Sequence, residues 1–240
     1  MISPAFDAAW QATWPAADYA DHGGLRVGRG VGGGGRVSAA RVVGDWDEAD
    51  IAAAEATHAG WGQPSLFAVE DGDGALAAAL AARGYRAANP TLILSAPLGP
   101  LTDRAIPPVT ALESWPPLAI QRDLWRQLGV GVGDARQAVM ARVTGPHTAI
   151  LGRVEDRAAG AAFAAVHGGT GTLHALAVLP RWRGRGLGAW MVRRAADFAA
   201  RHGATELALA VTEANAPARA LYAGLGFAPV GLYAYWQRDG

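Results

Sequence analysis

A short segment rich in glycine and arginine holds the residues best suited to bind an anion. It covers residues 179–188 (LPRWRGRGLG), with arginines at positions 181, 183 and 185. It follows an apolar strand predicted over 172–178 and precedes an amphipathic helix predicted over 186–202. Glycines let the main chain approach a ligand, and the first amides of a helix have no internal partners. Several donors spread over several residues fit a diphosphate better than a single carboxylate.

Two other phosphate-binding patterns are less consistent with this chain. A Walker loop requires lysine, and every one of the 21 basic residues is arginine. Residues 28–33 match G-x-G-x-x-G, but the pattern after them, at 36–43, alternates like a strand where a dinucleotide site needs a helix. We therefore interpret residues 28–33 as a flexible hairpin turn.

Two linked motifs make the chain recognisable. Residues 178–188 (VxPxxRGRGLG) resemble the pyrophosphate motif of the GNAT superfamily of acyl-CoA-dependent N-acyltransferases. Residues 215–227 (NxxAxxLYxxLGF) resemble the same family's second motif, and a predicted helix and strand separate the two. The resemblance covers roughly residues 105–240.

The resemblance implies a strand that splays from its neighbour, with acetyl-CoA bound in the gap as the acyl donor. The strand's main chain would pair with the pantetheine arm like an added strand, and the loop amides would hold the pyrophosphate. The implied binding residues are Leu176, Ala177, Val178, Arg183, Gly184, Arg185, Gly186, Leu187, Gly188, Ala189, Asn215 and Tyr222. Asn215 also fits a helix N-cap before Ala216 and Pro217, and both roles stay open.

Tyr222 is the predicted catalytic acid. Acyl transfer from a thioester to an amine expels a thiolate, which a phenol with a pKa near 10 can protonate. The resemblance implies that this tyrosine lies beside the sulfur of coenzyme A. The alternative is a core aromatic on a short helix, and Leu221 and Phe227 could fill that core instead.

The general base is left open by the sequence. Family members often carry a glutamate on the strand before the loop, where this chain has Thr172. His174 lies on the same face of that strand and titrates near neutral pH, so it is a candidate catalytic base. Glu213 is another candidate, and a chain of water molecules would need no named base.

The implied mechanism is direct attack of the amine on the thioester within a ternary complex. Cysteine is absent, so no thiol can carry the acyl group, and no metal-binding set is evident among the six histidines. A backbone N–H near Val178 would polarise the thioester carbonyl.

The order of elements predicts an α/β fold with a mixed sheet. The resemblance makes this sheet mostly antiparallel, splayed and flanked by helices, and an internal repeat makes the fold tandem. The expected helices are 47–59, 75–83, 116–128, 134–143, 186–202 and 216–223, and the expected strands are 36–43, 65–70, 91–95, 148–154, 158–167, 172–178, 206–212 and 232–237.

A proline-rich segment at 97–108 predicts a linker between a domain at 1–104 and one at 105–240. The first part has 7 arginines and 12 acidic residues, and the second has 14 and 9, so an acidic half precedes a basic one. Residues 80–85 (LAARGY) repeat 222–227 (YAGLGF), with Leu80 in the position of Tyr222. The first domain has only Gly44-Asp45-Trp46 before its helix, so we expect a degenerate copy that binds no coenzyme A.

The amino-acid composition limits the classes of binding partner. With 51% hydrophobic residues and no net charge, the chain predicts a globular protein with no nucleic-acid or membrane partner. We find no leader or transmembrane pattern and expect a soluble, cytoplasmic protein. The predicted function is an N-acetyltransferase whose acceptor is a small-molecule or peptide amine. The alternatives are an acyl-CoA-binding sensor and a pseudo-enzyme, and the oligomeric state is open.

Aromatic residues suggest two further sites. Those lining an acceptor pocket would be Trp115, Trp125, Tyr233, Tyr235 and Trp236, although core packing explains them equally well. Those between the halves would be Trp10, Trp14, Trp46 and Trp61, which we expect to form an interdomain core.

Overall fold

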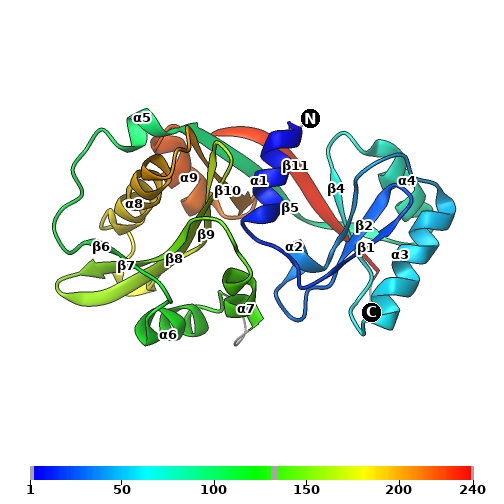
Figure 1. Cartoon of the computed structure of the whole chain (residues 1–240), viewed down its shortest axis with the longest axis horizontal. Coiled ribbons are helices and arrows are strands. Elements are labelled where there is room, and N and C mark those ends of the chain that lie inside the picture. The colour runs from blue at the N-terminus through cyan, green and yellow to red at the C-terminus, as the bar shows by residue number, and fades with distance from the viewer. Residues whose placement is uncertain (1–2, 131–134, 239–240) are drawn as a thin grey trace.

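A computed structural model describes residues 3–130 and 135–238, which form two lobes that share one sheet (Figure 1). The first lobe is built from α1 (Pro4–Ala12), β1 (Tyr19–His22), β2 (Leu25–Gly28), α2 (Gly35–Ser38), β3 (Ala40–Val42), α3 (Glu48–Gly60), β4 (Leu66–Glu70), α4 (Gly74–Ala82) and β5 (Arg86–Pro97). The second is built from α5 (Leu98–Leu101), β6 (Ala111–Ser114), α6 (Ala119–Gln127), α7 (Ala135–Ala141), β7 (His147–Val154), β8 (Arg157–His167), β9 (Thr170–Val178), a 3-10 turn (Pro180–Trp182), α8 (Leu187–Arg201), β10 (Glu206–Thr212), α9 (Ala216–Gly224) and β11 (Ala228–Gln237).

The sheet runs in the order β1-β2-β3-β4-β11-β5-β10-β9-β8-β7-β6 through the described residues. Only the β3–β4 and β9–β10 neighbours are parallel in this part of the chain, so the mixed, mostly antiparallel sheet is confirmed. Strand β11 lies between β4 and β5, and β5 lies between β11 and β10. Each lobe therefore lends its last strand to the other, and β11 ends beside β4 in the first lobe (Figure 1).

The two lobes repeat the same strand–helix–strand–helix–strand unit. The run β3–α3–β4–α4–β5 corresponds to β9–α8–β10–α9–β11, and each begins with a parallel strand pair. The ends of α4 and α9 also match. The amide of Tyr85 donates to the carbonyl of Leu80, and the amide of Phe227 donates to that of Tyr222, both at 3.0 Å. The structure thus aligns Leu80 with Tyr222, as the sequence predicts.

The exchanged strands bear on the domain division. A boundary near residue 104 leaves β5 with the first half and β11 with the second, yet each strand completes the sheet of the opposite lobe. Helix α1 packs against β8 and β9 of the second lobe, where Trp14 joins the larger hydrophobic core. The division into domains at 1–104 and 105–240 stays a prediction. One continuous sheet contains strands from both sides of the proposed boundary.

Helix α8 shows how the sequence pattern becomes packing. Its apolar stripe, which includes Leu187, Met191, Ala195 and Phe198, is buried against the sheet. Alternate residues of β10, such as Leu207 and Leu209, share one face of the strand and are buried in the same core. The same packing fixes where α8 begins, and hence where its free amides lie.

The strand predicted at 36–43 is wrong over its first half. Residues Gly35–Ser38 form the one-turn helix α2, and only Ala40–Val42 is a strand. Gly34 has φ +101, which permits the sharp turn into the helix, and Val37 is buried in the core of the second lobe. Four alternating residues are too few to separate a strand from a helical turn, and packing across the lobes decided it.

The first lobe also contains a hairpin, β1–β2, which turns at Gly23 and Gly24. The hairpin turn expected at 28–33 is therefore wrong. This segment follows β2 and leads into α2, so a short helix does follow the G-x-G-x-x-G pattern. The proline-rich segment contains the end of β5 and the short helix α5 before an irregular stretch that reaches β6.

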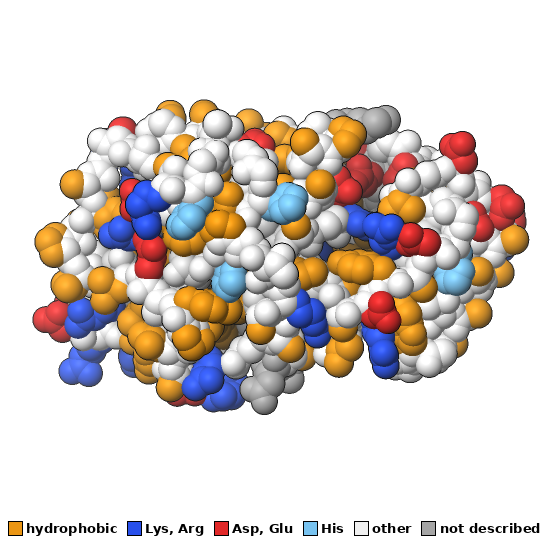
Figure 2. All heavy atoms as spheres, viewed as in Figure 1, with side chains coloured by type: hydrophobic (Ala, Val, Ile, Leu, Met, Phe, Trp, Pro, Cys, Tyr) orange, Lys and Arg blue, Asp and Glu red, His pale blue; other side chains and the backbone are white. Residues whose placement is uncertain are grey.

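Every helix within residues 3–130 and 135–238 is too short or too polar to span a lipid bilayer. Acidic side chains gather over the first lobe at the right of the face in Figure 2. This distribution agrees with the acidic first half and basic second half of the sequence.

Candidate functional site

Strands β9 and β10 pair over only part of their length. Their parallel register runs from Thr170↔Glu206 to Leu173↔Leu209, whereas β9 continues to Val178. Ala175, just past the last pair, has φ +53, and the pairing of β9 with β8 shifts register at the same level. The expected splay is therefore present, and it opens beside His174.

The three predicted strand residues lie on this open edge. Leu176, Ala177 and Val178 are all half-buried, and β8 pairs with Ala177 and Val178. The amide of Leu179 donates to Ala159 of β8 at 2.8 Å. Because main-chain groups alternate in direction along a strand, those of Val178 and Leu176 point toward the gap. They can pair with an extended ligand there.

The loop after β9 exposes the N-terminus of α8. Gly184 has φ +73, and Gly186, the N-cap residue, has φ +78, a conformation that other residues adopt only at a cost. No side chain caps this helix, and its first amides, at Leu187, Gly188 and Ala189, have no helical acceptor. Together with the positive end of the helix dipole, these amides form an anion site.

The loop arginines are held in place by local contacts. Arg183 Nε donates to the carbonyl of Val178 at 3.0 Å, which ties the loop to the open end of β9. Arg185 pairs with Glu155 at 2.7 Å and lies 4.8 Å from the ring centre of Trp182. Arg181 lies 5.9 Å from the same ring. The loop therefore carries its positive charge on an ordered frame.

Helices α8 and α9 approach each other closely at the loop. A Cβ on Gly188 would lie 3.0 Å from Cδ2 of Leu221 on α9, so a larger residue there would have to displace that side chain. Asn215 caps α9, and its Oδ1 accepts from the amide of Ala218 at 3.2 Å. The capping role that the sequence allowed is thus observed, and the ligand role of Asn215 stays a prediction.

Tyr222 lies on α9, one residue beyond Leu221. Its side chain is buried, with its ring 5.7 Å from that of Phe227, and burial raises its pKa to about 12. The hydroxyl of Tyr222 makes no hydrogen bond with any of the described residues. A neutral phenol with a free hydroxyl suits a proton donor, and its role as acid stays a prediction.

His174 is buried where the two lobes meet. Its Nδ1 lies 3.1 Å from Nη1 of Arg36 and its Nε2 lies 3.3 Å from Oγ1 of Thr13. Because Arg36 can only donate, Nδ1 must accept and the proton must sit on Nε2. Burial, with the nearby charge of Arg36, holds the pKa of His174 well below its usual value. Both ring nitrogens are occupied, which disfavours the predicted base role.

This burial predicts how stability depends on pH. His174 has a pKa near 6.5 in the unfolded chain and a lower one in the fold, so its contribution is complete above pH 6.5. It is lost as the pH falls from 6.5 toward the folded pKa, at up to about 1.4 kcal/mol per pH unit. Urea unfolding at pH 7.5, 6.0 and 5.0 should show a smaller loss in His174→Asn than in the parent. The exposed His167→Asn should behave like the parent, and equal losses in all three would contradict the assignment.

The predicted acceptor aromatics separate into different environments. Trp115 is exposed, with its ring 4.2 Å from that of His147, whereas Trp125 is buried and donates to the carbonyl of Ala175 at 2.8 Å. Trp236 packs against the core of the first lobe. Tyr233 and Tyr235 lie together between the lobes, with their hydroxyls 3.4 Å apart.

The aromatics expected between the halves also separate. Trp10 and Trp14 meet His174 across the lobes, at ring-centre distances of 5.8 and 4.9 Å. Trp46 and Trp61 pack at the edge of the first lobe's own core instead. The interdomain prediction is right for the first pair and wrong for the second.

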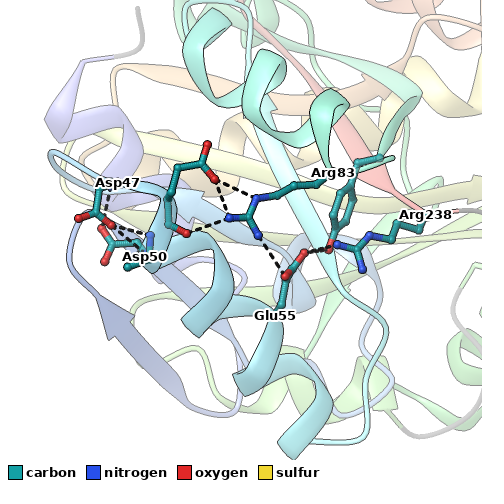
Figure 3. A network of polar contacts seen from close by, with 8 residues as sticks. Asp47, Asp50, Glu55, Arg83 and Arg238 are labelled. Carbon is teal, nitrogen blue, oxygen red and sulfur yellow. Dashed lines mark hydrogen bonds and ion pairs between the residues drawn. The ribbon is translucent and has the colours of Figure 1, made fainter.

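The helix of the first lobe that corresponds to α8 is α3, and its N-terminus is capped. Asp47 caps α3 by accepting from the amides of Ala49 and Asp50, at 2.7 and 3.1 Å (Figure 3). The amides that would bind an anion are thus satisfied by a carboxylate, which would also repel one. Leu80, at the position of Tyr222, is fully buried.

A network of ion pairs stabilises this side of the first lobe instead. Arg83 reaches Glu48 at 2.6 Å and Glu55 at 3.5 Å, and Tyr85 donates to Glu55 at 2.8 Å (Figure 3). Arg238, which follows β11, pairs with Glu55 at 2.5 Å. The exchanged strand is therefore fastened at its end to α3.

One residue near the site escaped the sequence interpretation. Arg36 belongs to α2 and contacts His174 and Trp10, which lie far from it in sequence. An arginine in a glycine-rich turn offers no local signal of such contacts. Its only sequence signal was the absence of an acidic residue between positions 22 and 44.

Comparisons with known proteins agree with this geometry. Residues 114–227 match the family described as the acetyltransferase (GNAT) family. A streptothricin acetyltransferase from Streptomyces lavendulae is 48% identical over 61 residues, which is 25% of this chain and 32% of that protein. The match thus spans about a third of that relative's length.

Solved structures show the same fold over most of the chain. A GCN5-related N-acetyltransferase from Kribbella flavida superposes with a TM-score of 0.73 at 20% identity, covering 100% of this chain and 97% of that one. A tandem GNAT protein from the clavulanic acid biosynthesis pathway superposes with a TM-score of 0.58 at 18% identity, covering 88% and 76%. At these identities the likeness concerns the fold, which includes its tandem arrangement.

Proposed function

Since residues 114–227 belong to the acetyltransferase (GNAT) family, we propose that the protein transfers an acetyl group from acetyl-CoA to a primary amine of a small molecule or peptide. One observation carries the proposal. The uncapped N-terminus of α8 lies directly after the strand that leaves its parallel neighbour, so an anion site adjoins an open strand edge. This pairing suits a ligand with a diphosphate and an extended amide-containing arm.

The chain's own groups fit that ligand. The amides from Arg183 to Ala189 would hold the pyrophosphate, and Gly184 and Gly186 keep their approach free of side chains. Leu176 and Val178 would pair with the arm through their main chains. Acetyl-CoA would supply an activated thioester, and the protein would orient it.

The transfer itself requires three proton movements. The attacking ammonium must first lose a proton, and the same nitrogen must lose a second one as the amide forms. As the new C–N bond forms and the C–S bond breaks, Tyr222 would donate its proton to the departing sulfur and recover one from solvent. Because both nitrogens of His174 are occupied, we propose that water carries both nitrogen protons away. A backbone N–H near Val178 would polarise the carbonyl during direct attack.

The first lobe would serve the reaction without binding coenzyme A. Its α3 is capped by Asp47, and it places Trp10 and Arg36 against β9. We propose that it forms one wall of the acceptor site.

The proposal is tested by release of free thiol from acetyl-CoA in the presence of a panel of amines. Amine-dependent release is the expected result. Binding of coenzyme A with no release for any amine would favour an acyl-CoA sensor. Ligand at about 100 times its dissociation constant should stabilise the fold by about 2.7 kcal/mol. The absence of any thermal stabilisation by coenzyme A would contradict both functions.

A further inference from the structure

The guanidinium of Arg36 is placed between the lobes without an acidic partner among the described residues. It stacks 3.6 Å from the ring centre of Trp10, and its Nη2 donates to the carbonyl of that residue. Its Nη1 donates to His174 at 3.1 Å. Its Nε is buried and has no acceptor in the described chain. Burial lowers the pKa of Arg36 to about 10, because desolvation disfavours its charged form.

A second arginine lies against the same loop. A Cβ on Gly34 would lie 3.4 Å from Nη2 of Arg136 on α7, and one on Gly35 would lie 3.1 Å from Cζ of Tyr235. Burial also lowers the pKa of Arg136, and it raises that of Tyr235, which interacts with both arginines. The described residues provide no carboxylate partner for Arg136 either.

These two cations differ from two other sheltered arginines of the described chain. Arg41 pairs with Asp7 at 3.2 Å, and Arg193 pairs with Asp103 at 2.5 Å. A charge held away from water is costly unless an opposite charge or hydrogen bonds compensate it. Arg36 and Arg136 therefore mark a place that an anion would stabilise, with tyrosine hydroxyls as further donors.

The position of Arg36 relates this place to the proposed reaction. It touches His174, the first residue of β9 beyond the pairing with β10, where the thioester would end. An anionic group on Arg36 would thus lie close to the amine that attacks. An amine and a carboxylate lie this close together in one molecule when both are attached to the same carbon atom.

Building on the proposed acetyl transfer, we infer that the acceptor is an amine with an adjacent carboxylate, as in an α-amino acid, and that Arg36 and Arg136 bind this carboxylate between the lobes. Arg136 suits the role because its planar fork matches a carboxylate, and Arg36 would contribute its charge and its unpaired Nε. A polycationic acceptor would instead bring positive charge toward two uncompensated guanidinium groups.

The test compares matched acceptors that differ only in this charge. The nineteen common amino acids that carry a primary α-amine, and their amides, are assayed for thiol release from acetyl-CoA. The parent should prefer the acids in kcat/KM by about 10- to 100-fold, as expected of a charge-assisted hydrogen-bond pair. Arg136→Gln should lose most of this preference, and Arg36→Lys, which keeps the charge but not the fork, should lose part of it.

Controls separate binding from folding. Thermal melting shows whether each variant is folded, and Arg26→Gln, on the exposed pair with Asp21, should keep the full preference. An equal rate for acids and amides in the parent would overturn the inference. An unchanged preference in a folded Arg136→Gln and a folded Arg36→Lys would overturn it as well.

Equilibrium binding distinguishes this inference from the proposed function. Calorimetry without acetyl-CoA uses N-acetyl-L-alanine, N-acetyl-L-phenylalanine and their amides as product probes. If no amine is acetylated yet the acid probes bind and Arg136→Gln loses them, the activity is wrong and the anion site stands. If amines are acetylated and the acid probes bind no better than their amides, the activity stands and the anion site is wrong.

Discussion

Gly186→Asp should weaken the binding of coenzyme A by at least 100-fold while leaving the fold intact. Gly186 is the N-cap of α8, and the first amides of that helix are free. An aspartate there would do what Asp47 does for α3, where its carboxylate accepts from Ala49 and Asp50. It would occupy the amides proposed to hold the pyrophosphate and would repel the phosphates.

The effect on stability should be small because two contributions oppose each other. The backbone at Gly186 has φ +78, which costs a non-glycine residue about 1–2 kcal/mol, although aspartate tolerates it better than most. A new N-cap contributes about 0.5–2 kcal/mol in the other direction. The free energy of unfolding should therefore change by less than about 1 kcal/mol.

Gly186→Asn is the matched control, since it has the same shape and capping capacity without the charge. Isothermal calorimetry should show one equivalent of coenzyme A for the parent, a weaker site for Gly186→Asn and the weakest for Gly186→Asp. A second equivalent in the parent would refute the expectation that the first lobe binds none. Equal affinity of all three proteins would show that the pyrophosphate lies elsewhere.

The loop that contains Gly186 could be predicted because its properties are local. The arginines at 181, 183 and 185, the glycines at 184, 186 and 188 and the helix that follows all lie within one stretch of sequence. The order of strands and helices after residue 147 follows from periodicity for the same reason. The repeat of Leu80 and Tyr222 at equivalent helix ends could also be predicted, because a helix end stopped by glycine is a local signal.

The partners of β5 and β11 could not be predicted. β5 and β11 each follow the second helix of equivalent units. The sequence of either strand is therefore compatible with pairing to β4 or to β10. Their exchange depends on how the complete lobes pack. Arg36 illustrates the same limit, since its contact with His174 spans 138 residues. Val37, next to Arg36, is buried in the core of the second lobe. This long-range contact favours a helical turn where the local pattern predicts a strand.

Tyr222→Phe should lower kcat by about 10²- to 10⁴-fold, the usual contribution of a general acid, and leave the affinity for coenzyme A unchanged. The hydroxyl has no partner among the described residues, so its removal costs no hydrogen bond within them. The pKa of about 12 keeps the phenol protonated through pH 10, so ionisation of Tyr222 should not lower the parent's rate between pH 8 and 10.

Tyr85→Phe is the matched control. Burial likewise raises the pKa of Tyr85 to about 12, but the hydroxyl of Tyr85 donates a hydrogen bond to Glu55 in the first lobe. That variant should lose about 1 kcal/mol of stability and keep its kcat. The measurements are steady-state kcat and the calorimetric affinity for coenzyme A. If Tyr222→Phe has the kcat of the parent, Tyr222 is not the acid and water protonates the thiolate.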